Sequence, residues 1–219
     1  MIKTFALGLT ALALLGSAAQ ASVTTYSSQS AFSSATTVTN TAGFESLPWG
    51  KSTASFTDGG VRFTKLGIDF YVTYAGQALT QNPNSFPTQA LSADGDENFR
   101  IALASGATFG SVGMDYATNR FGHPVITLYT ASGALIEAVT VPINPDTVGF
   151  IGIVSTTPIG YVTTTVDRGY IEDTAIDNVQ IGPLAAVAGA PEPAAWTLMM
   201  LGIGAMGGAL RARRKALAT

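Results

Sequence analysis

The chain has 219 residues, no cysteine, one histidine, and 11 Lys and Arg against 14 Asp and Glu, which gives a formal net charge of −3. The lack of cysteine excludes a disulfide scaffold, a thiolate metal site and a thiol nucleophile. Only 11% of the residues are charged and 47% are hydrophobic, which argues against a disordered chain. The basic residues between the two ends form no cluster in the sequence, which argues against nucleic-acid binding.

Residues 1–21 have the composition of a targeting segment. Lys3 precedes the apolar run from Phe5 to Leu15, and small residues follow as far as Ala19-Gln20-Ala21. A basic start, a short apolar core and an Ala-x-Ala ending are typical of a secretory signal peptide. We therefore expect the mature protein to begin near Ser22, outside the cytoplasm.

Residues 22–184 are predicted to form one domain of short strands separated by turn residues. Ile126 and Leu128 alternate with Thr127 and Tyr129, as one buried and one wetter face of a strand require. Gly133 is expected to take a positive φ in a hairpin turn, and helical periodicity is absent. The candidate strands are 61–65, 68–74, 99–104, 109–116, 125–130, 135–141, 148–154, 161–166 and 175–181. The pattern predicts an all-β fold, an antiparallel β-sandwich of jelly-roll type.

The charge of this domain differs from that of the whole chain. Residues 22–190 keep six of the 11 basic residues and 13 of the 14 acidic ones, so this part carries a charge near −7. Such a domain repels polyanions and suits neutral or cationic partners, or divalent metal. Solubility alone is the simpler explanation.

Catalytic motifs are absent from the sequence. There is no G-x-S-x-G and no H-E-x-x-H, and His123 stands alone in an expected surface turn. The acidic runs Asp94-Gly95-Asp96-Glu97 and Glu172-Asp173 would suit either a glycosidase-like acid and base or solvated turns. We favour the turns and predict that the protein is not an enzyme.

Aromatic side chains offer a more plausible route to a sugar, whose apolar faces stack on them. Trp49 is the only tryptophan between residues 22 and 190 and lies in an expected loop. We predict it as the ligand-binding residue, with Tyr71, Tyr74 and Tyr116 as further candidates. Each of these tyrosines would equally suit the core.

The C-terminal region has three parts in order. After a small, apolar linker at 185–190, Pro191-Glu192-Pro193 precedes an apolar stretch that contains Trp196, and a basic tail follows. We predict a transmembrane helix at 195–210, although a helix of about 16 residues spans about 24 Å against about 30 Å of bilayer hydrocarbon. The positive-inside rule then places the upstream domain beyond the inner membrane. The cations of the tail are Arg211, Arg213, Arg214 and Lys215.

This arrangement resembles the PEP-CTERM sorting signal of Gram-negative bacteria. The matching residues are Pro191, Glu192, Pro193, Trp196, Arg211, Arg213 and Arg214, within the segment 191–219. The resemblance implies recognition by an exosortase-type membrane protease, and export linked to exopolysaccharide or biofilm production.

The central domain also resembles the jelly-roll domains common in PEP-CTERM proteins, which are similar to carbohydrate-binding modules. The resemblance rests on runs such as Gly43-Phe44-Glu45, Phe109–Met114 and Ala175–Ile181 in this order. It implies a structural calcium ion (Ca²⁺) shared by Glu45 and Asp177. The alternative is that both carboxylates are solvated turn or cap residues.

Together, these features predict a non-enzymatic, exported surface or extracellular-matrix protein. It would be anchored in the inner membrane by its C-terminal helix until it is processed. The alternatives are a carbohydrate-binding module and a glycan-active enzyme that uses the acidic turns.

Overall fold

The computed structural model describes residues 22–51, 54–67, 71–73, 75–76, 78–79, 82–92, 98–119, 121, 123–142, 147–166, 174–184 and 193–216. The chain divides into two units: Ala21–Ala185, and Met1–Gln20 with Ala186–Thr219. The predicted signal peptide and the residues Pro191 and Glu192 lie outside the described residues.

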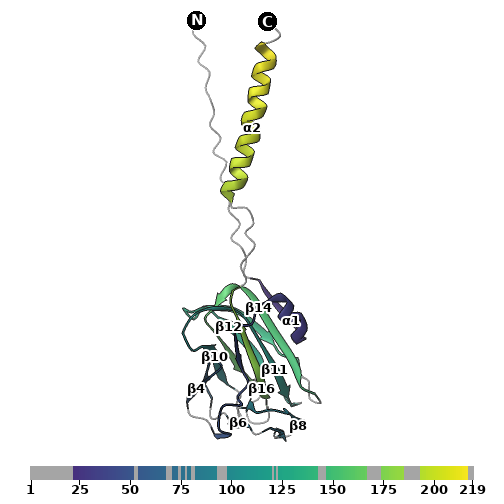
Figure 1. Cartoon of the computed structure of the whole chain (residues 1–219), viewed down its shortest axis with the longest axis vertical. Coiled ribbons are helices and arrows are strands. Elements are labelled where there is room, and N and C mark those ends of the chain that lie inside the picture. The colour runs from purple at the N-terminus through teal and green to yellow at the C-terminus, as the bar shows by residue number, and fades with distance from the viewer. Residues whose placement is uncertain are drawn as a thin grey trace. The chain divides into compact units, whose positions relative to one another are not determined.

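The unit Ala21–Ala185 contains two large antiparallel sheets (Figure 1). In the eight-stranded sheet, β2 pairs with β16, and the other strands lie in the order β1-β14-β11-β16-β9-β6-β3. The bounds in that order are Val23–Tyr26, Gly149–Ile159, Phe109–Thr118, Thr174–Gly182, Ala90–Ser92, Tyr71–Thr73 and Gly50–Lys51, with β2 at Asn40–Ala42.

The six-stranded sheet has the order β13-β12-β15-β10-β5-β4. The bounds in that order are Leu135–Thr140, Val125–Tyr129, Tyr161–Thr165, Phe99–Leu103, Val61–Lys65 and Ser55–Asp58. A small third sheet pairs β7 (Ala78–Leu79) with β8 (Asn82–Ser85). The chain passes repeatedly between the two large sheets from β10 to β16, as in a jelly roll, which confirms the predicted sandwich.

The core lies between the two large sheets. Val61 and Phe63 of β5 are buried while Arg62 between them is exposed, and β10 and β12 alternate in the same way. Strands β11 and β16 are buried along almost their whole length and therefore lack a simple alternation. One apolar cluster includes residues of both sheets, among them Phe44, Phe63, Ile153 and Ile181.

Most of the predicted strands match observed ones within the described residues, although β14 ends at Ile159, five residues beyond its predicted end. β5 has the predicted bounds, and the ends of β10, β12, β13 and β15 differ by one residue. Gly133 has φ 85° in the turn between β12 and β13, as expected.

The expectation of no helix in this domain was wrong. Helix α1 (Gln29–Ala35) begins after Ser28, whose side chain accepts a hydrogen bond from the Ala31 amide. It buries only Phe32, which packs on Phe150 at a ring-centroid distance of 5.7 Å. Gly152 makes room for this ring, because a Cβ there would lie 2.5 Å from Phe32. One buried residue in seven leaves no apolar periodicity to detect.

The other unit contains helix α2 (Pro193–Ala216), which includes the predicted segment 195–210. Its large apolar side chains are exposed, namely Leu198, Met199, Met200, Leu201, Ile203 and Met206. Among the described helices, none is both long and apolar enough to cross a membrane. The helix is confirmed, but this finding does not support the prediction that it spans the bilayer. The apolar stretch is limited by its composition and its length: four of the 17 uncharged residues at 194–210 are glycine, and the charged Arg211 follows directly.

Candidate functional site

Asp177 lies at an irregular point of β16. On one side of this strand, β2 pairs with Val179–Ile181 and β9 pairs with Ala175 and Ile176, so that Asp177 and Asn178 fall between the two pairings. On the other side, the register with β11 shifts between Gly113 and Asp115. Asn178 has φ 49°, a conformation that few residues other than glycine adopt. Such bulges redirect side chains and are common beside functional sites.

The Asp177 carboxylate is buried, with 1% of the residue exposed, and hydrogen bonds hold both of its oxygens. Oδ1 accepts from the backbone amide of Asn178 at 2.6 Å, and Oδ2 accepts from the Thr88 hydroxyl at 2.6 Å. Asp115 pairs with Asp177 across the sheet. The Asn178 side-chain amide donates to Asp115 Oδ2 at 2.8 Å and reaches Asp177 Oδ2 at 3.5 Å. Asn178 therefore bridges two carboxylates that would otherwise repel each other.

These hydrogen bonds only partly offset the energetic cost of removing the two carboxylates from water. Desolvation is the largest cause of the raised pKa of Asp177, which is about 6. Hydrogen bonds from Thr88 and Asn178 lower this pKa, while the charges of Asp115 and Glu45 raise it further. Burial also raises the pKa of Asp115, against the effect of the Asn178 hydrogen bond. Burial therefore makes the ionised form of Asp177 less favourable than that of a solvated aspartate.

Glu45 belongs to a tight turn that is bound to Asp58. The Asp58 carboxylate accepts from the amides of Gly43 and Phe44 at 3.1 and 2.9 Å and from the Ser46 hydroxyl at 2.7 Å. Phe44 is fully buried and has φ 64°, so the turn combines an anchored ring with an uncommon backbone conformation. These contacts fix the position of the exposed Glu45.

The segment Thr88–Gln89 joins the two predicted metal ligands. The Gln89 backbone amide donates to Glu45 Oε1 at 2.7 Å, one residue after the Thr88 hydroxyl that binds Asp177. With its side-chain nitrogen directed at them, Gln89 also donates to the carbonyl oxygens of Phe44 and Leu47, at 2.6 and 3.0 Å. Both predicted residues therefore belong to one connected site. The alternative of a solvated Asp177 was wrong, because the cross-strand contacts that bury it are invisible in the sequence.

The donor set fits a calcium ion in its chemistry but is not fully assembled. Glu45, Asp115 and Asp177 supply carboxylate oxygens, and the repulsion at Asp177 is of the kind that a cation relieves. Within the described ranges, no three His, Cys, Asp or Glu side chains are grouped closely enough to hold a metal. A calcium ion would therefore need carbonyl or water oxygens as well, since it takes six to eight ligands.

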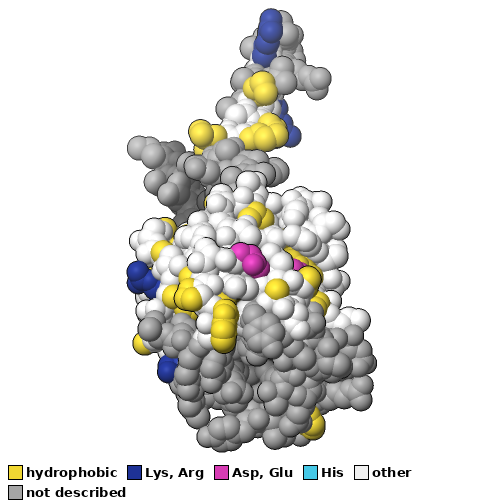
Figure 2. All heavy atoms as spheres, turned by 60° about the horizontal axis from the view of Figure 1, so that its bottom comes forward, with side chains coloured by type: hydrophobic (Ala, Val, Ile, Leu, Met, Phe, Trp, Pro, Cys, Tyr) yellow, Lys and Arg dark blue, Asp and Glu magenta, His cyan; other side chains and the backbone are white. Residues whose placement is uncertain are grey.

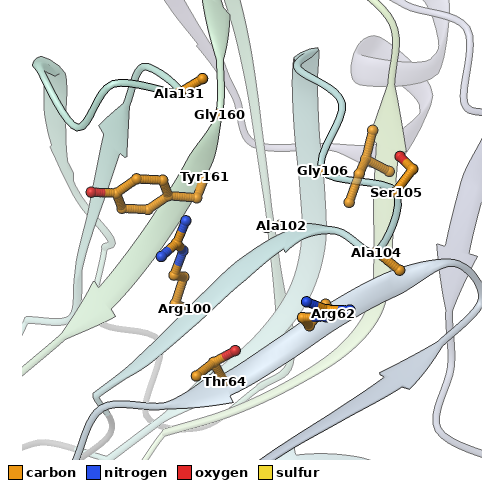
Figure 3. A pocket seen from close by; sticks show the side chains of 11 residues that line it. Arg62, Thr64, Arg100, Ala102, Ala104, Ser105, Gly106, Ala131, Gly160 and Tyr161 are labelled. Carbon is orange, nitrogen blue, oxygen red and sulfur yellow. The ribbon is translucent and has the colours of Figure 1, made fainter.

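A separate pocket of about 400 Å³ lies on the outer side of the six-stranded sheet (Figure 3). Arg62 and Thr64 enter it from β5, Arg100 and Ala102 from β10, and Tyr161 from β15. The rest of the described lining consists of Leu103 and five small residues, which are Ala104, Ser105, Gly106, Ala131 and Gly160. A Cβ on Gly160 would lie 2.4 Å from the backbone of Ala131, so glycine permits the close approach of these two segments.

Three polar side chains of the pocket, Arg62, Arg100 and Tyr161, form a row across four neighbouring strands together with Tyr129, which lies beside the pocket lining. Tyr129 of β12 is opposite Tyr161, and their rings stack at a centroid distance of 4.9 Å. The Arg100 guanidinium lies 3.7 Å from the centroid of the Tyr161 ring. Arg62 pairs with Ala102 in the next strand, which places it diagonally from Arg100. We refer to Arg62, Arg100, Tyr161 and Tyr129 as the Arg–Tyr row.

The Arg–Tyr row was not predicted from the sequence. Arg62 and Arg100 are 38 residues apart and form no cluster in the sequence, and only the pairing of β5 with β10 brings them together. On the face shown in Figure 2, the described charged side chains are few and scattered. The alternation around Arg62 and Arg100 was the available signal, because it places both outside the core.

The other predicted residues are distributed as follows. Trp49 is 70% exposed and is not among the residues that line the pocket. Tyr116 is a core residue at 5% exposure, and His123 is exposed in a loop, as expected. Tyr74 and the acidic runs Asp94–Glu97 and Glu172–Asp173 lie outside the described residues, as does the side chain of Tyr71.

The Asp115–Asp177 pair was also missed, although an aspartate within the apolar run 112–117 was a detectable signal. Two carboxyls with raised pKa values suggest acid and base chemistry. Asp177 is nearly inaccessible, however, and both of its oxygens are already bound. A glycoside would therefore have no approach to Asp177.

Comparison with known proteins identifies one segment of the chain. The PEP-CTERM protein-sorting motif matches residues 190–215, as the sequence analysis predicted. This motif marks the chain as an exported protein with a membrane-associated sorting signal. No curated protein matches the chain.

Several solved structures show a likeness to the chain. A variant of the family 29 carbohydrate-binding module CBM29-2 in complex with mannohexaose has 15% identity over 76% of this chain and 94% of its own, with a TM-score of 0.31. Another family 29 module has 14% identity over 76% and 91%, with a TM-score of 0.30. A CBM29-2 variant with cellulohexaose has 15% identity over 75% and 93%, with a TM-score of 0.29. Nothing about a ligand of this chain follows from scores at this level.

Proposed function

We propose that this protein is a non-enzymatic component of the cell surface or extracellular matrix. The observation that carries the proposal is the sorting motif at residues 190–215, downstream of the β-sandwich unit Ala21–Ala185. An exosortase-type protease at the inner membrane cleaves near Pro191-Glu192-Pro193 and releases the sandwich to the surface, in association with exopolysaccharide. The exposed apolar side chains of α2 support contact of this segment with lipid before cleavage.

Cell fractionation of the native producer tests the role of the sorting motif. Intact protein should reach the surface or the medium, whereas a chain truncated after residue 189 should be absent from the surface fraction. A matched control replaces His123, an exposed loop residue outside the motif and outside the described pocket lining, with alanine and should leave sorting unchanged. Equal surface amounts of the truncated and intact chains would contradict the proposal.

Carbohydrate binding is the second candidate function, and a specific feature favours it. The pocket with the Arg–Tyr row combines hydrogen-bond donors with a stacked aromatic pair in a volume of about 400 Å³. Small-molecule sites have volumes of about 300–1,000 Å³ and a few converging polar groups. The exposed Trp49 offers a second surface for a sugar.

We also propose a structural calcium ion at Glu45 and Asp177, with carbonyl and water oxygens as the remaining ligands. Its support is the connection through Thr88–Gln89 and the raised pKa of the buried Asp177. The ion would stabilise the contact between the turn at Glu45 and the last strand. Its role would be in folding stability and not in catalysis.

A further inference from the structure

The pocket of the Arg–Tyr row is positively charged in a domain whose overall charge is negative. Two of the six basic residues between positions 22 and 190 line it, and none of its described lining residues carries a carboxylate. In the part of the chain that the structure describes, neither guanidinium forms a salt bridge. Two cations that have no salt-bridge partner among the described residues therefore line one cavity.

The geometry of Arg100 prepares it for an anion. Its guanidinium stacks on Tyr161, which is itself held against Tyr129. Stacking covers one face of the planar guanidinium and leaves the N–H groups at its edge available for hydrogen bonds. Because the neighbouring rings restrict the side chain, less conformational entropy is lost when a ligand binds.

Arg62 is placed to act on the same ligand. Diagonal neighbours in an antiparallel sheet lie about 7–8 Å apart, within the joint reach of two long side chains. Figure 3 shows Arg62 and Arg100 on adjacent strands, and Ser105 in the segment that follows the Arg100 strand; all three line the cavity. The hydroxyls of Thr64 and Ser105 add groups that suit sugar hydroxyls.

The chemistry of the lining selects the ligand class. Planar guanidinium groups match carboxylates in a bidentate geometry. The charge near −7 of residues 22–190 disfavours a long polyanion, so the pocket suits a short acidic segment or a single charged ring. We propose that the pocket binds the carboxylate of a uronic acid residue in an acidic glycan, with Arg62 and Arg100 as the binding residues. This inference rests on the proposed carbohydrate binding and names its ligand class.

Calorimetric titration of the full chain with tetragalacturonate tests the inference, and the fully methyl-esterified tetramer is the matched neutral probe. We expect the acidic tetramer to bind at least tenfold more tightly than the ester. Arg100→Gln and Arg62→Gln should each weaken binding of the acid about tenfold or more, because a hydrogen bond to a charged group contributes about 1.5–3 kcal/mol. Lys65→Gln removes the same charge from β5 outside the described pocket lining and should change the affinity less than twofold.

The outcomes separate this inference from the broader proposals. Equal binding of the acid and the ester would overturn the preference for uronic acids and leave carbohydrate binding standing. No binding of either tetramer would overturn carbohydrate binding at this pocket, while the fractionation experiment would still decide the surface role. Displacement of the bound tetramer by equimolar inorganic sulfate would show a simple anion site and would also overturn the inference. Thermal melting checks that each variant is folded, and the exposed Arg62 supplies the variant least coupled to the core.

Discussion

Replacing Phe63 with alanine should lower the free energy of unfolding by about 3–5 kcal/mol. Phe63 is fully buried between the sheets, and its ring lies 5.1 Å from the Phe44 ring and 5.2 Å from the Phe56 ring. The substitution removes the transfer free energy of the ring, leaves a cavity and breaks both aromatic contacts. A domain of this size has a total stability of about 5–15 kcal/mol, so the effect is a large fraction of it.

Urea denaturation followed by circular dichroism measures the effect. Phe63→Leu keeps much of the volume and should lose less than half as much stability. Phe121→Ala makes the same chemical change at a side chain that is 40% exposed and should shift the stability by about 0.5 kcal/mol or less. Similar losses at Phe63 and Phe121 would show that the packing of this core is not as described.

Addition of calcium at about a hundred times its Kd should stabilise the protein by about 2.7 kcal/mol, which corresponds to a rise in Tm of about 5–10 °C. Asp177→Asn keeps the shape of the side chain but removes a ligand charge, and it should abolish the rise. Glu137→Gln, at an exposed position of β13, should leave the rise intact. A wild-type Tm that responds neither to calcium nor to a chelator would exclude the ion.

The Asp177 carboxyl also makes the free energy of unfolding depend on pH when calcium is absent. The pKa of Asp177 is about 6 in the folded protein, against 3.8 for an aspartate free of such surroundings, so the folded state binds the proton more tightly than the unfolded chain. Its contribution is therefore fully present below about pH 4 and is lost as the pH rises to about 6. Asp177→Asn should lack this loss, and thermal melts between pH 4 and 7 with a chelator present would show the difference.

The strands that the sequence predicts well are those with one wet face. β5, β10 and β12 alternate clearly, because strands with one wet face bury every second side chain. β1 and β2 escaped prediction because Val23–Tyr26 and Asn40–Ala42 are short and polar, and their pairing with β14 and β16 stabilises them. Tertiary pairing is not encoded in a local pattern.

The candidate sites also differ in how far the sequence predicts them. Glu45 and Asp177 were identified through a resemblance, and the structure connects them through Thr88 and Gln89, which no local motif marks. The Arg–Tyr row depends wholly on register, since its four residues come from four different strands. A binding site on the face of a sheet is a property of strand order, and a single sequence does not reveal that order.

We expect the sorting motif to direct export and processing of the sandwich. Mass spectrometry of the protein recovered from the surface and from the medium tests this expectation, because it locates both ends of the mature chain. The N-terminus should lie near Ser22 and the C-terminus near Pro191-Glu192-Pro193, with the segment that follows removed. Recovery of the uncut chain of 219 residues from the cytosol, with no processed form outside the cell, would contradict it.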